Sequence, residues 1–259
     1  MSSATPRMPR PSLRPGVVLA PVLVVGALLV VWQLGTSLTG TSVTVLPSPA
    51  TILTQADWPA IGAATMSTIG SVLAGFALGN LVGFALALLV SASRPLADII
   101  YPGAVMVRSI PIVALAPFIT LFFGRGVLSA VVVGALIVFF PTLVNTIVGL
   151  RSVPQEALEL GHVFNAGPVF QYVRVRIPFA MPWFVSALRI SAPGAVLGVM
   201  TAEWVIGGAG LGRLVVQSWL GLDIPTMWGA VVLSAVVAWA LFSVVSLAER
   251  LFLGWAVRT

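Results

Sequence analysis

Hydrophobic positions along the chain gather into six long runs, and the short segments between the runs hold most of the charged residues. The runs are Val17–Ser37, Ile61–Ser91, Tyr101–Phe123, Val127–Leu150, Phe179–Ile206 and Thr226–Trp255. A helix needs about 20 mostly apolar residues to cross the roughly 30 Å hydrocarbon core of a membrane. Each run reaches this length, so the pattern predicts an all-α integral membrane protein with six transmembrane helices.

Two of the runs carry a further pattern. The third run contains Pro102, Pro111 and Pro117, and because proline removes a backbone donor we expect a kink or a break there. The second run has small residues at fourfold spacing, which share one helical face and predict close packing against another helix. These residues are Ser67, Ser71, Gly75, Gly79, Gly83 and Ala87.

The arginines predict which end of each span faces the cytoplasm. If successive spans alternate in direction, nine arginines fall in cytoplasmic segments and only Arg125 and Arg213 fall outside. Because cytoplasmic loops carry the excess of basic residues, both termini are expected in the cytoplasm, with residues 1–16 as a cytoplasmic tail. The alternative for the first span, residues 17–37, is a cleaved signal peptide, although its apolar run is longer than such peptides have.

Composition excludes several classes of protein. The 259-residue chain is 59% hydrophobic and only 8% charged, whereas soluble domains average roughly 25% charged residues. A soluble enzyme and a nucleic-acid-binding domain are therefore excluded. With no cysteine and a single histidine, His162, a thiolate or multi-histidine metal site is excluded as well.

One segment between spans, residues 151–178, is longer than the others and is patterned like a helix–turn–helix. Ser152 and Gln155 fit a capping box at the start of a helix. Asn165 and the following Gly and Pro are typical of a helix end. The apolar stripe on the first helix is Val153, Ala157, Leu160 and Phe164, and a second short helix is expected over Val169–Arg176.

Two interpretations of this cytoplasmic segment follow from its pattern. It is either a hairpin that rests on the lipid surface or a docking element for a cytosolic protein. Glu156 and Glu159 favour the protein partner, because an anionic membrane leaflet repels acidic side chains.

The segment resembles the EAA loop of type I importer permeases of the ATP-binding-cassette (ABC) class. In the preferred register, Glu159-Leu160-Gly161 takes the place of Glu-Ala-Ala, and Asn165 takes the place of the turn glycine. Ile177-Pro178 takes the place of the closing Ile-x-Leu-Pro. The departures from alanine and glycine leave the turn possible, because asparagine is the best substitute for glycine at positive φ.

Further motifs resemble the nitrate, taurine and alkanesulfonate branch of these permeases. They are Leu46-Pro47-Ser48-Pro49, Val107-Arg108-Ser109-Ile110-Pro111, Phe123-Gly124-Arg125-Gly126, Leu188-Arg189-Ile190, Ala202-Glu203 and Gly210-Leu211-Gly212. The resemblance implies a type I transmembrane core over residues 61–255, with the loop 151–178 as its coupling loop. It also implies a multi-pass protein of the bacterial inner membrane, two permease copies, two cytosolic ATPases and an extracytoplasmic solute-binding protein.

The resemblance implies roles for the coupling-loop residues. Glu159 would make a charged contact in the docking cleft of the ATPase, beside Leu160 and Gly161. Asn165 would set the turn, and Ile177 and Pro178 would lead into the next span. The apolar stripe would pack the hairpin together. Because the chain has no P-loop motif and no lysine, ATP would be bound and hydrolysed by the partner, and no cofactor is expected on this chain.

Charged residues within spans are costly in lipid and usually face a cavity or the interior of the bundle. Arg108 and Arg189 lie at similar depth, and with Pro111 they are the candidates for the pathway of an anionic solute such as a sulfonate. The alternative is a purely structural role, through backbone carbonyls or by reaching to the interface. Glu203 lies near the outer end, where we expect it to pair with Arg213 or Arg125 as part of either an external gate or a rim for the solute-binding protein.

Two other functions compete with the importer permease. An integral membrane enzyme would need convergent acids, bases or metal ligands within its spans, and the sequence does not supply them. A self-contained secondary transporter would show paired broken helices and ionisable residues at the midplane. The secondary transporter stays as the alternative, and the patterned cytoplasmic loop is the feature that separates the two.

Overall fold

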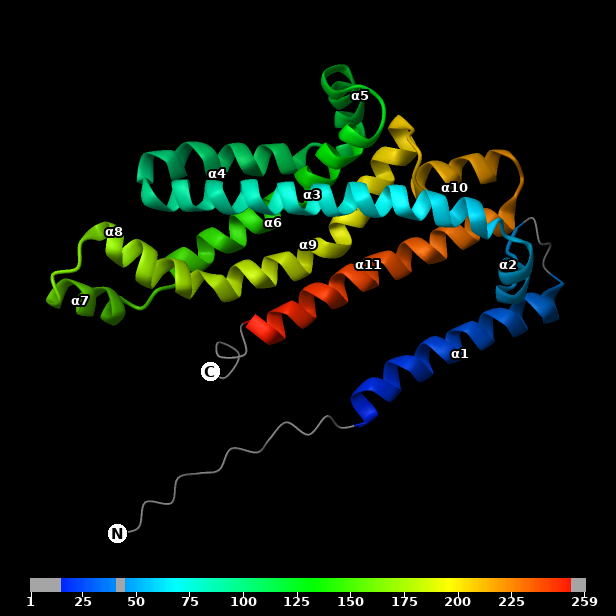
Figure 1. Cartoon of the computed structure of the whole chain (residues 1–259), viewed down its shortest axis with the longest axis horizontal. Coiled ribbons are helices and arrows are strands. Elements are labelled where there is room, and N and C mark those ends of the chain that lie inside the picture. Colours follow the sequence, from blue (N-terminus) through cyan, green and yellow to red (C-terminus); the bar gives the residue numbers. More distant parts are fainter. Residues whose placement is uncertain (1–14, 41–44, 253–259) are drawn as a thin grey trace, which may run out of the picture.

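The computed structural model describes residues 15–40 and 45–252, and all regular structure within these ranges is helical (Figure 1). The elements are α1 (Pro15–Thr39), α2 (Pro49–Gln55), α3 (Trp58–Ala92), α4 (Arg94–Ser109), α5 (Ile112–Phe123), α6 (Val127–Arg151), α7 (Gln155–Val163), α8 (Pro168–Gln171), the π-helical turn η1 (Tyr172–Arg176), α9 (Ile177–Ile206), α10 (Leu211–Leu220) and α11 (Ile224–Phe252).

Four helices among the described residues are long and apolar enough to cross a membrane. They are α3, α6, the continuous stretch Pro168–Ile206 and α11. Two shorter apolar helices, Leu23–Thr39 within α1 and α5 itself, accompany them. The all-α membrane architecture is therefore confirmed, whereas the count of six crossings stays a prediction.

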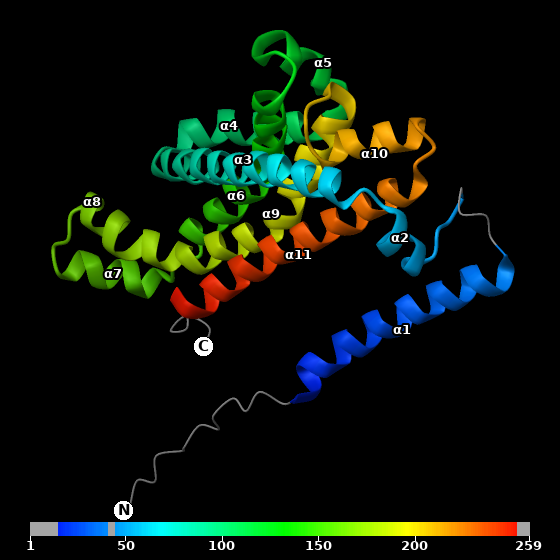
Figure 2. The ribbon, with the colours of Figure 1, turned by 45° about the vertical axis from the view of Figure 1, so that its right-hand side comes forward.

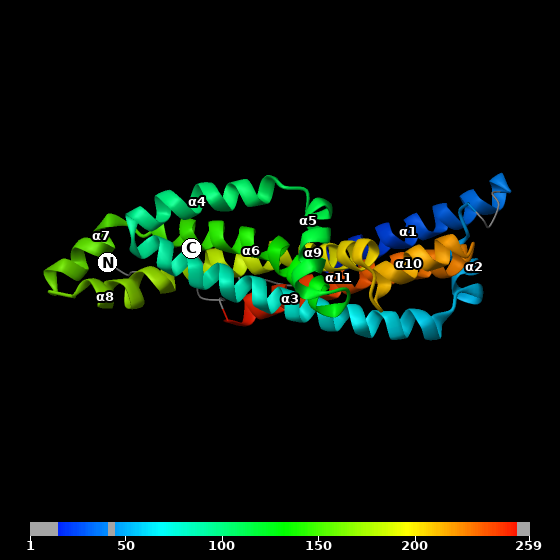
Figure 3. The same cartoon turned by 90° about the horizontal axis from the view of Figure 1, so that it is seen from above.

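The third apolar run is broken in two, as its prolines predict. α4 ends at Ser109, and α5 starts at Ile112 after Pro111, whose carbonyl accepts the Ala114 N–H at 2.8 Å. Pro102 lies inside α4. α4 begins at Arg94, earlier than the apolar pattern indicates, because charged residues in its first turns interrupt the hydrophobic run. α4 lies alongside α3 (Figures 1 and 3).

The small residues of α3 allow a very close approach to α6. A Cβ atom added at Gly75 would lie 2.9 Å from the carbonyl oxygen of Val131, and one added at Gly83 would lie 2.8 Å from that of Phe139. At Gly79 the added atom would overlap the Ala135 carbonyl. The predicted close packing along this stripe is confirmed, and α6 is the helix that the stripe faces.

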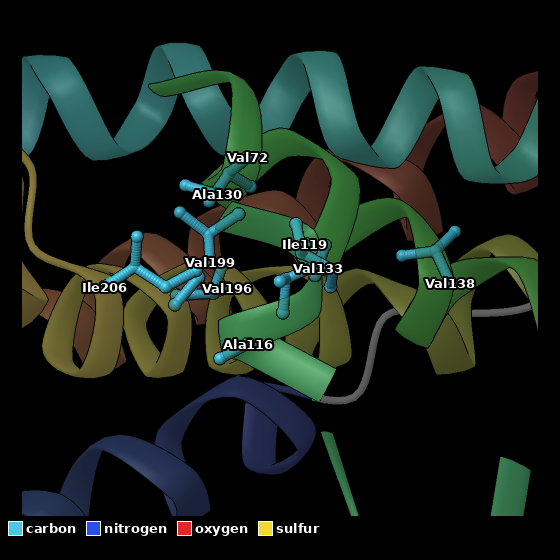
Figure 4. Close-up of a cluster of buried hydrophobic side chains, with 11 residues drawn as sticks. Val72, Ala116, Ile119, Ala130, Val133, Val138, Val196, Val199 and Ile206 are labelled. Carbon is cyan, nitrogen blue, oxygen red and sulfur yellow. The ribbon is translucent and has the colours of Figure 1, made fainter. Parts of the chain in front are cut away.

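The core forms around α6, which packs between α3 and α9 (Figure 4). Buried aliphatic side chains come from four helices, and those labelled in Figure 4 are Val72, Ala116, Ile119, Ala130, Val133, Val138, Val196, Val199 and Ile206. α1 lies apart from this bundle (Figure 2), and its Trp32 ring contacts Trp228 of α11 with the centroids 5.4 Å apart. The central helices therefore form one packed unit with α1 at its periphery.

Candidate functional site

Two groups of the predicted functional residues lie toward opposite ends of the bundle. α7 and α8 project at one end, and α10 packs near the other (Figures 1 and 3). The first end holds the hairpin formed by α7, α8 and η1, and the second holds Glu203.

Asn165 makes the turn of the hairpin, as its sequence position predicts. Its φ is 53°, a left-handed conformation that asparagine tolerates better than most residues. The N–H of Ala166 then donates to the Gly161 carbonyl at 2.9 Å, which closes the end of α7. The direction in which α8 leaves α7 is therefore set at this one residue.

Gly161 has a packing role that its sequence does not reveal. A Cβ atom at this position would lie 3.1 Å from Nε2 of Gln171, whose side chain is buried. Gln171 Nε2 also donates to the Ala166 carbonyl, at 3.3 Å. The glycine that weakens α7 by propensity thus lets α8 pack against it.

The capping box predicted for α7 is wrong. Ser152 stands at the C-cap of α6, where its Oγ donates to the Gly149 carbonyl at 2.9 Å. The Pro154 carbonyl instead accepts the Ala157 N–H at the start of α7. The segment between the two helices is so short that the same serine could have served either end, and it caps the preceding helix.

The apolar stripe does not pack the hairpin together, contrary to the prediction. Val153 is buried, but Leu160 is 58% exposed and Phe164 is 76% exposed. Because Gly161 and Gln171 form the inner contact, the stripe's later members face outward. They belong to a set that we name the hairpin apolar surface, which comprises Leu160, Val163, Phe164, Val169, Phe170 and Val173. Glu159 is exposed beside it.

The base of the hairpin is bonded to the core helices. The hydroxyl of Tyr172 donates to the Leu88 carbonyl of α3 at 2.6 Å. Arg176 Nη1 reaches the Leu150 carbonyl at the end of α6, at 3.5 Å. η1 runs directly into α9, where Ile177 and Pro178 are half-buried. A displacement of the hairpin would therefore reach α3, α6 and α9 together.

Glu203 is the buried acid of the opposite end, with 3% of its surface exposed. The Thr68 hydroxyl lies 3.0 Å from both of its carboxylate oxygens, and the Gly212 N–H donates to Oε2 at 2.9 Å. Thr68 Oγ1 accepts the Leu211 N–H at 2.8 Å. The carboxylate thus binds the start of α10, where free N–H groups favour an acceptor, and joins α3, α9 and α10.

The predicted pairing of Glu203 with an arginine is wrong. Within the described part of the chain, the structure gives Glu203 no ion pair with Arg213 or Arg125. Arg213 Nη1 donates to the Gly208 carbonyl at 2.8 Å instead. Backbone and hydroxyl donors already satisfy the carboxylate, and sequence reasoning missed Thr68 as one of them. This contact explains the second glycine of the Gly-Leu-Gly motif, because a Cβ atom at Gly212 would lie 2.9 Å from the Cβ atom of Glu203.

Arg189 pairs with an acid that sequence reasoning also missed. Its Nη1 lies 2.9 Å from Oε2 of Glu249 on α11. The side chains are 43% and 16% exposed, respectively, so the pair lies at the edge of the bundle. Glu249 is an acid inside the sixth apolar run, and that position was the available signal. Arg108 belongs to α4, but its side chain lies outside the described part of the structure.

Pro111 lies at the break between α4 and α5 and lines a cavity of about 640 Å³. The cavity is bounded by α3, α4, α5 and α6, and its other lining residues include Ile110, Leu136 and Phe139. Pro111, Arg189 and Glu203 are not brought together: each lies in a different local environment.

Comparison with known proteins identifies the family. Residues 79–253 match the family described as "Binding-protein-dependent transport system inner membrane component". A probable ABC transporter permease protein of Haemophilus influenzae is 34% identical over 86% of this chain and 92% of its own length. The riboflavin transport system permease protein RibX of Chloroflexus aurantiacus is 34% identical over 88% of this chain and 87% of its own length.

More distant relatives agree with this assignment. The putative aliphatic sulfonates transport permease protein SsuC of Bacillus subtilis is 28% identical over 90% of this chain and 86% of its own length. A chain of the MetNI methionine ABC transporter, solved in inward-facing conformations, superposes with a TM-score of 0.60 at 20% identity, covering 78% of this chain and 98% of that one. The latter shows a shared fold, and the resemblance seen in the sequence is confirmed. The chain therefore belongs to the inner membrane components of binding-protein-dependent transport systems, and it is an ABC transporter permease.

Proposed function

We propose that this permease forms the translocation pathway for a small solute and is driven by a separate ATPase that docks on the hairpin. The hairpin apolar surface carries the proposal. Six large apolar side chains, each more than half exposed, project from an element that hydrogen bonds tie to α3 and α6. An exposed apolar cluster on a firmly attached element is what a protein partner requires.

Each coupling residue has a role in this proposal. Leu160 supplies apolar contact area, and the exposed Glu159 supplies a charge at its edge. Gly161 and Asn165 shape the hairpin, through the Gln171 contact and the left-handed turn. Ile177 and Pro178 begin α9 and would carry the movement of the hairpin into the bundle. Closure of the ATPases on ATP would then shift α9 relative to its neighbours.

The complex that we propose has two copies of this chain, two cytosolic ATPases and an extracytoplasmic solute-binding protein. ATP would be bound by the ATPases alone, since the permease has neither a P-loop nor a lysine. The hairpin and both termini would face the cytoplasm, in line with the arginine distribution. Residues 61–255 would form the type I transmembrane core, and residues 17–37 an additional span.

A different observation supports the proposed role of each pathway residue. Glu203 would act as the gate by holding the start of α10 against α3. Pro111 would act through the cavity at the helix break. The expectation of an anionic solute relies on Arg108 and Arg189. Because Arg189 is paired with Glu249, that expectation now has less support. The anionic solute therefore stays a prediction.

Purification from native membranes in mild detergent tests the proposal. A P-loop ATPase should co-elute with the permease in stoichiometric amount and be identified by mass. The double variant Leu160→Ala/Phe164→Ala should lose the ATPase, while the control Leu38→Ala, an 84% exposed leucine on α1, should retain it. If the wild-type chain elutes alone under conditions that preserve other importers, the proposed docking of an ATPase on the hairpin is wrong.

A further inference from the structure

A second pocket opens at the end of the bundle opposite the hairpin. It measures about 360 Å³ and is bounded by the first turns of α3, by α10 and by the loop 207–210 that leads into α10. α10 lies between the candidate spans Pro168–Ile206 and Ile224–Leu251 and belongs to neither (Figures 1 and 3). Six of the nine lining residues are alanine or glycine, so the walls leave room for a side chain from another molecule.

Two polar side chains line this pocket, Arg213 and Gln217 of α10. Arg213 Nη1 donates to the Gly208 carbonyl at 2.8 Å. With its amide oxygen oriented toward the guanidinium, Gln217 accepts from Nε at 3.1 Å and from Nη2 at 3.2 Å. A guanidinium carries five N–H groups in one rigid plane, so these contacts leave two of them, one on each Nη nitrogen. The guanidinium is therefore held in place and can still donate to a ligand.

The acidic side chains at this end already have other partners. The Glu203 carboxylate lies against Gly210, and hydroxyl and backbone donors satisfy it. Asp57 caps the start of α3, and Asp223 accepts a backbone N–H in the first turn of α11. Among the residues that the structure describes, none forms an ion pair with Arg213. The pocket therefore presents a positive charge that is available to an acid from outside the chain.

The exposed face of α10 combines polar and apolar groups. Arg213, Gln217 and Leu220 follow one another at spacings of four and three, so they share one helical face, and Leu220 is 70% exposed. A charged side chain is costly on a face directed at lipid. Arginine beside an apolar anchor is instead typical of protein–protein interfaces. The family depends on a binding protein, and the hairpin at the opposite end is already assigned to the ATPase.

We propose that the pocket at Arg213 receives an acidic side chain of the extracytoplasmic solute-binding protein. The inference rests on the proposed function, which places the α10 end outside the cytoplasm. The carboxylate would accept from the two remaining N–H groups of the guanidinium in a charge-assisted pair, and Leu220 would supply apolar contact. Because Arg213 also holds the Gly208 carbonyl, the docked protein would contact the loop that lies against Glu203. A free anionic solute shares the carboxylate chemistry but would leave Leu220 uncovered.

Binding of the solute-binding protein to the permease–ATPase complex in lipid nanodiscs tests the inference. The probe is the protein recovered with the complex from crosslinked native membranes, identified by mass and then produced separately. Arg213→Gln removes the charge, whereas Ala63→Phe fills the pocket from α3 and keeps the bonds of Arg213. The matched controls are Arg125→Gln, at an exposed arginine that does not line the pocket, and Gly62→Phe, where nothing lies within 4 Å of an added Cβ.

We expect the dissociation constant to rise about tenfold or more in Arg213→Gln and in Ala63→Phe, and to stay nearly unchanged in both controls. Raising the salt concentration from about 0.05 M to about 0.5 M should weaken binding to the wild type and affect Arg213→Gln much less, because salt screens an exposed charge pair. Retention of the ATPase is measured in the same nanodiscs, so failure of docking at the hairpin is seen separately from failure of the pocket.

Four results would overturn the inference. The first is a wild-type complex that retains its ATPase and does not bind the solute-binding protein. The second is equal weakening by Arg125→Gln and Arg213→Gln, which would indicate a general effect of surface charge. The third is unchanged binding in Ala63→Phe. The fourth is pocket-dependent binding of free acetate, detected by ligand-observed NMR, while both pocket variants leave the affinity for the protein unchanged, which would assign the pocket to a small anion.

Discussion

The two ends of this molecule differ in which groups they expose and which they bury. At the hairpin end, large apolar side chains are exposed and the polar contacts of Gln171 are buried inside. At the α10 end, a carboxylate is buried and bound by Thr68 and the Gly212 N–H. The hairpin leaves surface available for a partner, whereas the Glu203 cluster satisfies itself. In the proposed function the first end makes an external contact, whereas the bonds of the second end hold the bundle's own helices in place.

Removing the Glu203 side chain should have the largest effect and should act on the protein itself. Glu203→Ala leaves Thr68 and the Gly212 N–H without their acceptor in a buried site. Each such group costs about 1–3 kcal/mol, so we expect a markedly lower thermal midpoint in detergent and loss of uptake. Glu203→Gln keeps the shape and one acceptor oxygen, so its thermal midpoint should fall between those of the wild type and Glu203→Ala. A Glu203→Ala variant as stable as wild type would show that the cluster is not structural.

A substitution between the two ends tests whether they are connected by rigid packing. Gly79→Ala places a methyl group against the Ala135 carbonyl, so α3 and α6 must separate. Overpacking of this kind costs about 1–3 kcal/mol. Gly70→Ala is the matched control, because nothing lies within 4 Å of a Cβ added there and alanine favours the helix. Equal thermal midpoints for the two variants would contradict the close packing.

These contrasts also show what the sequence could and could not predict. The helical nature of the apolar runs, the break at Pro111 and the left-handed turn at Asn165 depend on neighbours in the chain, and the structure confirms them. The partners of Glu203 and Arg189 do not depend on neighbours. Thr68 lies 135 positions from Glu203, and Glu249 lies 60 positions from Arg189. No local pattern marks such pairs.

The wrong predictions have physical causes of the same kind. Ser152 could cap either of two helices, and local reasoning had no way to rank them. Leu160 and Phe164 share a helical face, but which face is covered was decided by Gly161 and Gln171, ten positions apart. Amphipathic periodicity identifies an apolar face without identifying the surface that covers it.

Truncating the hairpin apolar surface should affect the partner and spare the permease. Phe164→Ala removes a ring that is 76% exposed, so the thermal midpoint should change little. If that ring is an anchor in an interface, its removal should weaken ATPase binding at least tenfold, or about 1.4 kcal/mol or more. Titration of the purified ATPase against nanodisc-embedded permease measures this. A fall in stability without a change in binding would reverse the contrast between the two ends.

The turn residue should give the smallest effect and the most specific one. Asn165 has φ of 53°, a region that costs an alanine about 1 kcal/mol more than it costs glycine. Asn165→Ala should therefore weaken ATPase binding several-fold by misdirecting α8, while Asn165→Gly should restore it. The same ATPase titration compares the two variants. The exposed side chain of Asn165 is lost in both, so rescue by glycine would assign the effect to backbone conformation. Equal weakening in both variants would instead mean that the asparagine side chain itself contacts the partner.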